Sequence, residues 1–267
     1  MKRDDLPLAA VQPSADAAWR VLHEAASAPY RPAGRFAWHF ARGKLGRDPV
    51  FRGLLERGDL ACDARVVDIG CGQGLMASLL QACGNLAARG HWPAAWPAAP
   101  RAESYHGIEL MPRDVERARA ATSSLALAPH FERNDMRRAV LPPCELVVML
   151  DVLHYVDPPA QSALLARVRD ALLQGRSERG PGATKQPRRL LLRVGDAASV
   201  RGFAVSQWVD RLVTLTRGHM APPTWGRPLA EWVSLLQELG FDVQSVPMSQ
   251  GTPFANVLLV ADVIGRS

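Results

Sequence analysis

The stretch Val66-Val-Asp-Ile-Gly-Cys-Gly-Gln-Gly-Leu75 decides the fold of this 267-residue chain. An apolar run ends at Ile69, and the glycines that follow let the backbone turn sharply and approach a ligand closely before a helix begins. Leu75 stands where the fingerprint of dinucleotide-binding proteins has its third glycine, and Asp68 lies two residues before the first glycine. A diphosphate disfavours a carboxylate at that position, whereas an ammonium group favours it. The stretch therefore indicates a nucleoside that carries an amino acid rather than a nicotinamide dinucleotide.

Short apolar runs alternate with helical patterns on the C-terminal side of this turn. Strands are predicted at residues 64–69, 104–110, 129–133, 145–150, 190–194, 242–246 and 255–263. Helices are predicted at residues 75–83, 112–127, 159–173, 203–216 and 229–239. Apolar strands that alternate with helices are typical of a mostly parallel sheet covered on both faces. The sequence therefore predicts a doubly wound, Rossmann-like α/β domain.

Three parts of the chain stand apart from this alternation, an N-terminal segment and two loops. Residues 1–60 are expected to form a helical N-terminal cap, whose centre at 35–44 is rich in aromatic and basic residues. Residues 61–267 are expected to form the α/β domain, with loop insertions at 85–103 and 174–189. Long loops of this kind are often surface insertions or functional lids.

Composition limits the class of protein. With 48% hydrophobic and 22% charged residues, the chain fits an ordinary globular protein, and no apolar run reaches the roughly 18–20 residues of a membrane span. The N-terminal residues do not read as a secretory signal. The four cysteines show no zinc-site or disulfide spacing, so we expect a cytoplasmic protein without a metal site. Because no apolar run is long enough to span a membrane, we expect no integral membrane contact.

The net charge of +6 leaves a nucleic-acid partner open without requiring one. The excess of cations gathers at residues 35–57 and 174–189. A solvated protein face explains such clusters at least as simply as a binding surface does.

The glycine-rich stretch resembles motif I of class I S-adenosylmethionine-dependent methyltransferases, and the resemblance covers roughly residues 60–263. It implies a seven-stranded sheet in the order 3-2-1-4-5-7-6 with strand seven antiparallel. It also implies S-adenosyl-L-methionine as cofactor and S-adenosyl-L-homocysteine as product. The cofactor-binding residues that it implies are Asp68, Gly70, Cys71, Gly72, Gly74, Glu109, Leu110, Asp135, Met136, Asp151 and Lys44.

The resemblance gives several of these residues separate roles. Glu109 ends the second predicted strand, where the family has an acid on the ribose hydroxyls. Asp135 would face the adenine amino group with Met136 beside the ring, although Asn-Asp is also ordinary turn chemistry. Lys44 would pair with the cofactor carboxylate, or else belong to a solvated helix face. Asp68 and Glu109 are 41 residues apart, about twice the usual step of roughly 20, so the Glu109 assignment depends on the insertion at 85–103.

The acceptor is expected beyond the carboxyl ends of the fourth and fifth strands. His154 and Tyr155 follow the fourth strand, and His154 is the first candidate for a base; the alternative is that it only shapes the pocket. His39 and His219 are second candidates. Trp38, Phe40, Trp208 and Trp225 would line an aromatic pocket, or else belong to the core. Cys71 is expected to pack rather than to react, because no base is paired with it.

Other methyltransferase classes fit less well. Asp157-Pro-Pro-Ala160 lacks the aromatic residue that amino-directed DNA methyltransferases place after this strand, which disfavours a flipped base. Asp151 and Asp196 do not complete the oxygen ligands of a catechol-type magnesium site, because Ala197 stands where that class has asparagine. We therefore expect no metal.

A narrower resemblance concerns the acceptor. Residues 40–45, 151–155 and 249–256 are similar to methyltransferases of bacterial aryl-polyene (xanthomonadin-like) pigment biosynthesis. This similarity implies a phenolic or polyketide-type acceptor, carried by an acidic acyl carrier protein that would suit the basic residues at 35–57. The hypothesis is methyl transfer to such a small aromatic acceptor. The alternatives are an RNA or protein methyltransferase, a non-catalytic adenosylmethionine-binding protein, or an NAD oxidoreductase.

Overall fold

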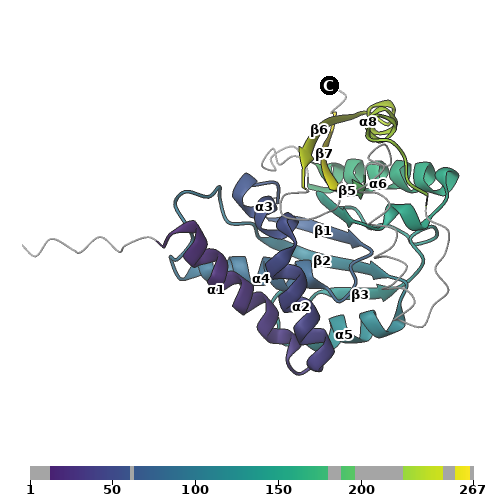
Figure 1. The fold of residues 1–267 in the computed structure, drawn as a ribbon. Helices are drawn as coiled ribbons and strands as arrows, with labels where there is room; N and C mark the ends of the chain where they lie inside the picture. Colours follow the sequence, from purple (N-terminus) through teal and green to yellow (C-terminus); the bar gives the residue numbers. More distant parts are fainter. Residues whose placement is uncertain (1–12, 61–62, 180–187, 196–224, 249–255, 265–267) are drawn as a thin grey trace, which may run out of the picture.

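The computed structural model describes residues 13–60, 63–179, 188–195, 225–248 and 256–264, and its strands form one seven-stranded sheet (Figure 1). The strand order is β3-β2-β1-β4-β5-β7-β6. The strands are β1 (Ala64–Ile69), β2 (Ala102–Glu109), β3 (His130–Arg133), β4 (Leu146–Leu150), β5 (Arg189–Gly195), β6 (Phe241–Pro247) and β7 (Asn256–Val263). Neighbours from β3 to β5 pair in parallel, whereas β7 runs antiparallel to β5 and β6. The order and the reversed β7 confirm the predicted sheet.

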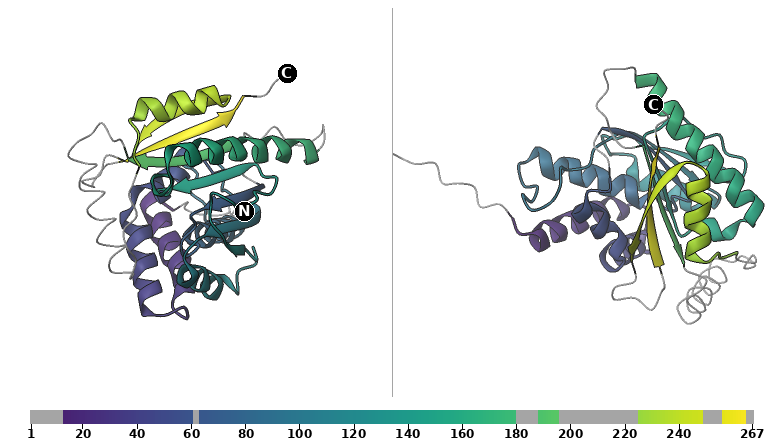
Figure 2. Two further views of the ribbon diagram at one scale, coloured as in Figure 1. Left: turned by 90° about the vertical axis from the view of Figure 1, so that its right-hand side faces the viewer. Right: turned by 90° about the horizontal axis from the view of Figure 1, so that it is seen from above.

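Helices cover both faces of the sheet (Figure 2). One layer contains α1 (Ala15–Ser27), α2 (Arg35–Arg47), α3 (Pro49–Arg57), α4 (Leu75–Ala88) and α5 (Pro112–Thr122). The other contains α6 (Pro158–Arg179) and α8 (Leu229–Glu238), and the short 3-10 helices are η1 (Ala28–Tyr30) and η2 (Leu153–Tyr155). No helix in the described ranges combines the length and the apolar character that crossing a bilayer requires.

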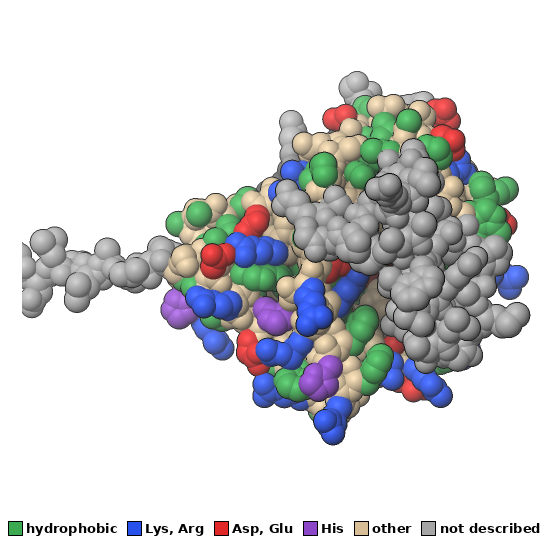
Figure 3. All heavy atoms as spheres, in the orientation of Figure 1, with side chains coloured by type: hydrophobic (Ala, Val, Ile, Leu, Met, Phe, Trp, Pro, Cys, Tyr) green, Lys and Arg blue, Asp and Glu red, His purple; other side chains and the backbone are tan. Residues whose placement is uncertain are grey.

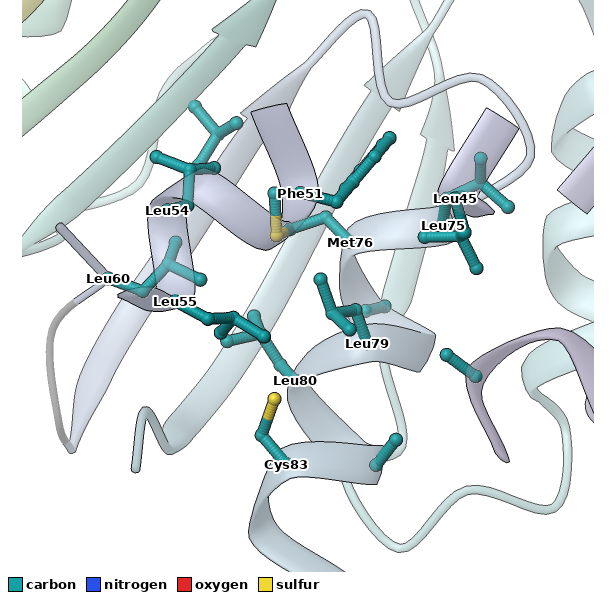
Figure 4. Close-up of a cluster of buried hydrophobic side chains, with 14 of the residues drawn as sticks. Leu45, Phe51, Leu54, Leu55, Leu60, Leu75, Met76, Leu79, Leu80 and Cys83 are labelled. Atoms are coloured by element: carbon teal, nitrogen blue, oxygen red, sulfur yellow. The ribbon is translucent and has the colours of Figure 1, made fainter. Parts of the chain in front are cut away.

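The core consists of two clusters, one on each face of the sheet. Because successive side chains of a strand point to opposite faces, Leu191 packs in the first cluster, whereas Leu190 and Leu192 pack in the second. In the first cluster, Phe51 of α3 lies in the same group as Met76 of α4 (Figure 4). The N-terminal helices therefore share a core with the sheet.

Both predicted insertions are shorter in the structure. The first, predicted at 85–103, loses its ends because α4 continues to Ala88 and β2 begins at Ala102. Leu86 is buried and prolongs the apolar face of α4, and Gly90 follows its end with a φ of 71°.

The second insertion, predicted at 174–189, begins later because α6 continues to Arg179. Gly175 in α6 is a point of close approach, since a Cβ there would lie 2.1 Å from the carbonyl oxygen of Cys144. A glycine that looks like a helix breaker in sequence therefore lets α6 pass the chain before β4. In contrast, α5 ends at Thr122 rather than at 127; the hydroxyl of Thr122 donates to the carbonyl of Ala118 at 2.8 Å. The helix predicted at 203–216 lies outside the described residues.

Candidate cofactor-binding and active site

The turn between β1 and α4 has a left-handed backbone at each of its three glycines. Gly70, Gly72 and Gly74 have φ values of 73°, 54° and 75°. The backbone N–H groups of Gly70 and Cys71 both donate to the carbonyl of Ile108 in β2, at 2.8 and 3.2 Å. The turn is therefore held against the carboxyl end of the neighbouring strand.

The three glycines have different surroundings. A Cβ on Gly70 would lie 2.2 Å from Val152, and one on Gly74 would lie 2.7 Å from the ring of Phe131, so close packing accounts for both. A Cβ on Gly72 would meet nothing within 4 Å. Gly72 thus borders open space, which is where a ligand can approach the backbone closely. The thiol of Cys71 is buried, and burial raises its pKa well above the ordinary value, as expected for a packing residue.

Asp68 is the buried carboxylate of β1. Its side chain accepts a hydrogen bond from the hydroxyl of Tyr105 on β2. Burial raises its pKa to about 7, against the opposing effect of the Tyr105 hydrogen bond, and the charge of Glu109 raises it further. The ionised form of this group is costly in the protein alone.

Glu109 lies at the end of β2, beside Asp68. Its carboxylate accepts the backbone N–H of Gly72 at 2.9 Å and that of Met111 at 2.8 Å, so it ties the glycine turn to the start of α5. Burial raises its pKa although these N–H groups favour the charged form. The loop at 89–101 accounts for the wide sequence spacing, because β1 and β2 still pair in register through Ile69 and Ile108.

Asp68 and Glu109 fit a cationic ligand. Among the described residues no lysine, arginine or histidine pairs with either carboxylate, and the charge of Glu109 makes the ionised form of Asp68 still more costly. A positive charge placed between them and the open side of Gly72 would favour both ionised forms. S-adenosylmethionine carries such charges on its ammonium and sulfonium groups.

Three other predicted cofactor residues lie near this edge of the sheet. Asp135, after β3, turns its carboxylate to Arg137, with which it forms hydrogen bonds of 2.9 and 3.1 Å through the guanidinium Nε; this contact lowers its pKa. Met136 is half-buried, and its carbonyl accepts from Arg167 at 2.7 Å. Leu110 is 55% exposed directly after β2. The adenine-binding roles of Asp135 and Met136 stay predictions.

The acceptor-side residues lie in η2, directly after β4. His154 and Tyr155 are half-buried, and their ring centroids are 4.1 Å apart. The carbonyl of His154 accepts the backbone N–H of Trp225 at 2.9 Å. The buried Gln161 donates to the carbonyls of Leu153, Val156 and Trp225 at 3.2, 3.0 and 3.0 Å, which fixes η2 to the segment around Trp225.

Lys44 and Asp151 are part of one ionic network. The ammonium of Lys44 lies 2.7 Å from Asp48 and 3.7 Å from Asp151. The guanidinium of Arg193 binds the carboxylates of both Asp48 and Asp151. Lys44 is therefore at the same strand edge as the glycine turn, since Asp151 directly precedes Val152, the residue against Gly70.

The aromatic residues of α2 belong largely to the core. Trp38 and Phe40 pack against the first cluster, and the guanidinium groups of Arg31 and Arg42 each lie 5.5 Å from the centroid of the Trp38 ring. His39 is exposed beside Trp38. The other predicted candidates on this side, His219 and Trp208, lie outside the described residues.

The basic residues at 35–57 are interleaved with acids. Arg42 pairs with Glu24, Arg52 with Asp16 and Glu56, and Arg57 with Asp59. Lysine and arginine side chains gather over the N-terminal helices together with aspartate and glutamate (Figure 3). Such pairing favours the solvated-face interpretation of this cluster over a nucleic-acid surface.

The structure adds residues to the site that were not predicted from sequence, among them Tyr105, Tyr30 and Arg193. Tyr105 on β2 donates its hydroxyl hydrogen bond to Asp68, and a buried tyrosine hydroxyl usually finds such a partner. The hydroxyl of the buried Tyr30 donates to the carbonyl of Gln73 at 2.8 Å and so joins η1 to the glycine turn. Arg193 in β5 joins Asp48 to Asp151. The partners of Tyr30 and Arg193 are far away in sequence and leave no local pattern.

A sheet in this strand order with β7 reversed, and a triple-glycine turn after β1, is the class I S-adenosylmethionine-dependent methyltransferase fold. The chain belongs to the methyltransferase domain family, whose family model matches residues 37–176, just over half of its length. Two solved structures of this fold, 18% and 16% identical to the chain, hold S-adenosylhomocysteine and S-adenosylmethionine. Comparison with curated proteins finds no match.

Solved structures with the same fold include three enzymes of low sequence identity. Magnesium protoporphyrin IX methyltransferase from Synechocystis, with bound S-adenosylhomocysteine, has a TM-score of 0.52 and 18% identity over 89% of this chain and 94% of that chain. Human N-acetylserotonin methyltransferase, in complex with S-adenosylmethionine, has a TM-score of 0.53 and 17% identity, over 91% of this chain and 59% of that chain. Mitomycin 7-O-methyltransferase has a TM-score of 0.50 and 20% identity, over 94% and 71%.

Proposed function

We propose that this chain transfers the methyl group of S-adenosylmethionine to a small aromatic acceptor through a phenolic hydroxyl, with His154 as the base. The observation that carries the proposal is the position of η2 beside the glycine turn. Val152 packs so closely against Gly70 that a Cβ on the glycine would lie 2.2 Å from it. His154 and Tyr155 follow Val152 within three residues. Histidine is the side chain that most often removes a proton from a reacting hydroxyl near neutral pH.

The cofactor residues follow from the charges at the strand ends. We assign Asp68 to a cationic group of the cofactor and Glu109 to its ribose hydroxyls, since a carboxylate accepts up to about four hydrogen bonds and Glu109 uses two. Gly72 offers the open approach beside them. Lys44, 37% exposed at the same edge, is assigned to the cofactor carboxylate, which would compete with its present partner Asp48.

When bound, the cofactor supplies an electrophilic methyl group on a positively charged sulfur. The protein's part is to orient the acceptor, exclude water and accept a proton. His154 would take that proton on its imidazole ring, and Tyr155 would lie against the acceptor. Gln161 and the N–H of Trp225 hold the backbone of η2 in place for both.

The acceptor class is supported by the names of the similar structures. These names refer to small molecules: mitomycin, N-acetylserotonin and magnesium protoporphyrin IX. The half-buried Trp225 beside η2 suits an aromatic acceptor. The resemblance to aryl-polyene methyltransferases extends the proposal to a phenolic or polyketide acceptor on an acyl carrier protein, in the cytoplasm.

A labelled-methyl assay tests the proposal. The chain is incubated with isotopically labelled S-adenosylmethionine and a panel of phenols and carrier-bound aromatic acceptors, and products are sought by mass spectrometry. We expect one added methyl on a phenol and a rate at least about 100-fold lower in His154→Ala, the usual contribution of a positioned base. Salt-sensitive methylation of added RNA in place of a phenol would refute the proposed acceptor class.

A further inference from the structure

Two arginines of β5 hold α3 at its two ends. Arg189 and Arg193 are four residues apart and so lie on one face of the strand, about 13 Å from each other at 3.3 Å per residue. The nine residues of α3 span nearly the same length, about 13.5 Å. Arg193 binds Asp48, the N-cap of α3, and Arg189 donates to the carbonyl of Asp59, two residues after α3, at 3.2 Å.

The face between the two arginines is covered by α3. Leu191, midway between them, packs in the same cluster as Phe51 and Leu54 of α3. The side chain of Asp48 also accepts the N–H of Val50 at 3.1 Å, so one carboxylate caps the helix and binds the strand. Arg193 and Arg189 therefore form two matched anchors of the N-terminal helices on the sheet.

Only the Arg193 anchor reaches the candidate site. Its Nε donates to Asp151 at 2.8 Å and one Nη donates to Asp48 at 2.7 Å, while its side chain is 1% exposed. Asp151 has a left-handed φ of 59°, which is uncommon for a residue other than glycine. The neighbour of Asp151 is Val152, which packs against Gly70. The Arg189 anchor binds Asp262 at the other end of β5.

We propose that Arg193 is a positioning residue: by binding Asp48 and Asp151 together, it fixes the N-terminal helices and the end of β4 around the glycine turn. This inference rests on the proposed cofactor site.

The experiment compares variants at the two anchors. Asp48→Asn keeps an N-cap residue for α3 while removing the charge that faces Arg193, and Arg193→Lys keeps the charge while losing the bidentate contacts. The matched controls at the distal anchor are Arg189→Lys and Asp59→Asn, which removes the carboxylate 3.9 Å from the Arg189 guanidinium. The dissociation constant for S-adenosylhomocysteine is measured by calorimetry at 25 °C, and the unfolding temperature of each variant is recorded.

We expect Asp48→Asn and Arg193→Lys each to weaken binding about tenfold, a typical coupling between sites. The distal variants should lower the unfolding temperature by a similar amount and change the dissociation constant less than about twofold. Equal weakening at both anchors, or unchanged binding in Asp48→Asn, would overturn the positioning role. Asp48→Asn decides the question if Arg193→Lys does not fold. Absence of binding by the unaltered chain would instead refute the proposed cofactor site.

Discussion

At the scale of single residues, Asp68 is the group whose environment is hardest to explain by stability alone. It is buried near the carboxyl end of β1, with 6% of its surface exposed, and its partner among the described residues is a neutral hydroxyl, that of Tyr105. Natural proteins tolerate such costs at sites where a ligand later satisfies the group. Asp68 therefore has the character of a binding residue that lowers the stability of the folded protein without ligand.

The pH dependence of cofactor affinity follows from the pKa of Asp68. Burial raises this pKa to about 7 in the protein alone, and a cationic ligand favours the ionised form. Affinity for S-adenosylmethionine should therefore rise with pH, by up to about tenfold per unit below pH 7, and level off above it. Calorimetric titrations between pH 5.5 and 8.5 measure this. The Asp68→Asn variant should bind more weakly with a flatter profile, and a flat profile in the unaltered chain would contradict the assignment.

The same group makes a prediction about stability without ligand. Its folded pKa lies above the value of about 3.9 expected in the unfolded chain, so the unfolded state loses its proton first as pH rises. The folded state is therefore penalised increasingly from about pH 4 to pH 7, and constantly above that. Asp68→Asn should raise the unfolding temperature by several degrees at pH 8, at about 2–4 °C per kcal/mol, and by less at pH 5. Thermal unfolding monitored by circular dichroism decides it, and an equal or larger gain at pH 5 would count against the raised pKa.

At the scale of elements, different glycines of the turn after β1 serve packing and ligand binding. Gly70→Ala would place a methyl group 2.2 Å from Val152, whereas Gly72→Ala meets open space and adds only the cost of a left-handed alanine, about 1–2 kcal/mol. Gly70→Ala should therefore mainly reduce stability. Gly72→Ala should fold and lose affinity for S-adenosylhomocysteine at least about tenfold, because the ligand approaches there. Thermal unfolding and calorimetry on both variants test this contrast, which fails if Gly72→Ala binds normally.

Two glycines inside helices should respond to alanine in opposite directions. A Cβ on Gly84 in α4 meets nothing within 4 Å, so Gly84→Ala should stabilise the chain by about 0.5–1 kcal/mol through helix propensity. A Cβ on Gly175 in α6 would lie 2.1 Å from the carbonyl oxygen of Cys144, so Gly175→Ala should destabilise it by about 1–3 kcal/mol. Denaturant unfolding gives both values. Stabilisation by Gly175→Ala would show that α6 does not pass so close to Cys144.

Strands were easier to predict than helix ends. The bounds of β1 match the prediction because an apolar run is closed by Asp63 on one side and Gly70 on the other. The end of α6 was placed too early because glycine weakens a helix in sequence, whereas Gly175 serves close packing in the structure. The motif residues at the ends of β1 and β2 were predictable because parallel strands bring their carboxyl ends to one edge.

At the scale of the whole molecule, sequence could not give the contacts between the N-terminal helices and the sheet. Arg193 and Asp48 are 145 residues apart, and Tyr30 and Gln73 are 43 apart. No periodicity or local spacing encodes such pairs, because the two partners meet only when the N-terminal helices pack on the assembled sheet. A cap predicted only as helical thus becomes, in the structure, a layer that shares the core and contacts the glycine turn.

The central claim is that the carboxylates of Asp68 and Glu109 beside Gly72 bind the cationic methyl donor or its product. Isothermal calorimetry of the folded chain with S-adenosylhomocysteine at pH 8 tests it most directly. A saturable heat with one ligand per chain, strongly reduced in Asp68→Asn, is the predicted result. A folded chain that gives no heat with S-adenosylhomocysteine, or that binds NAD in its place, would contradict the account.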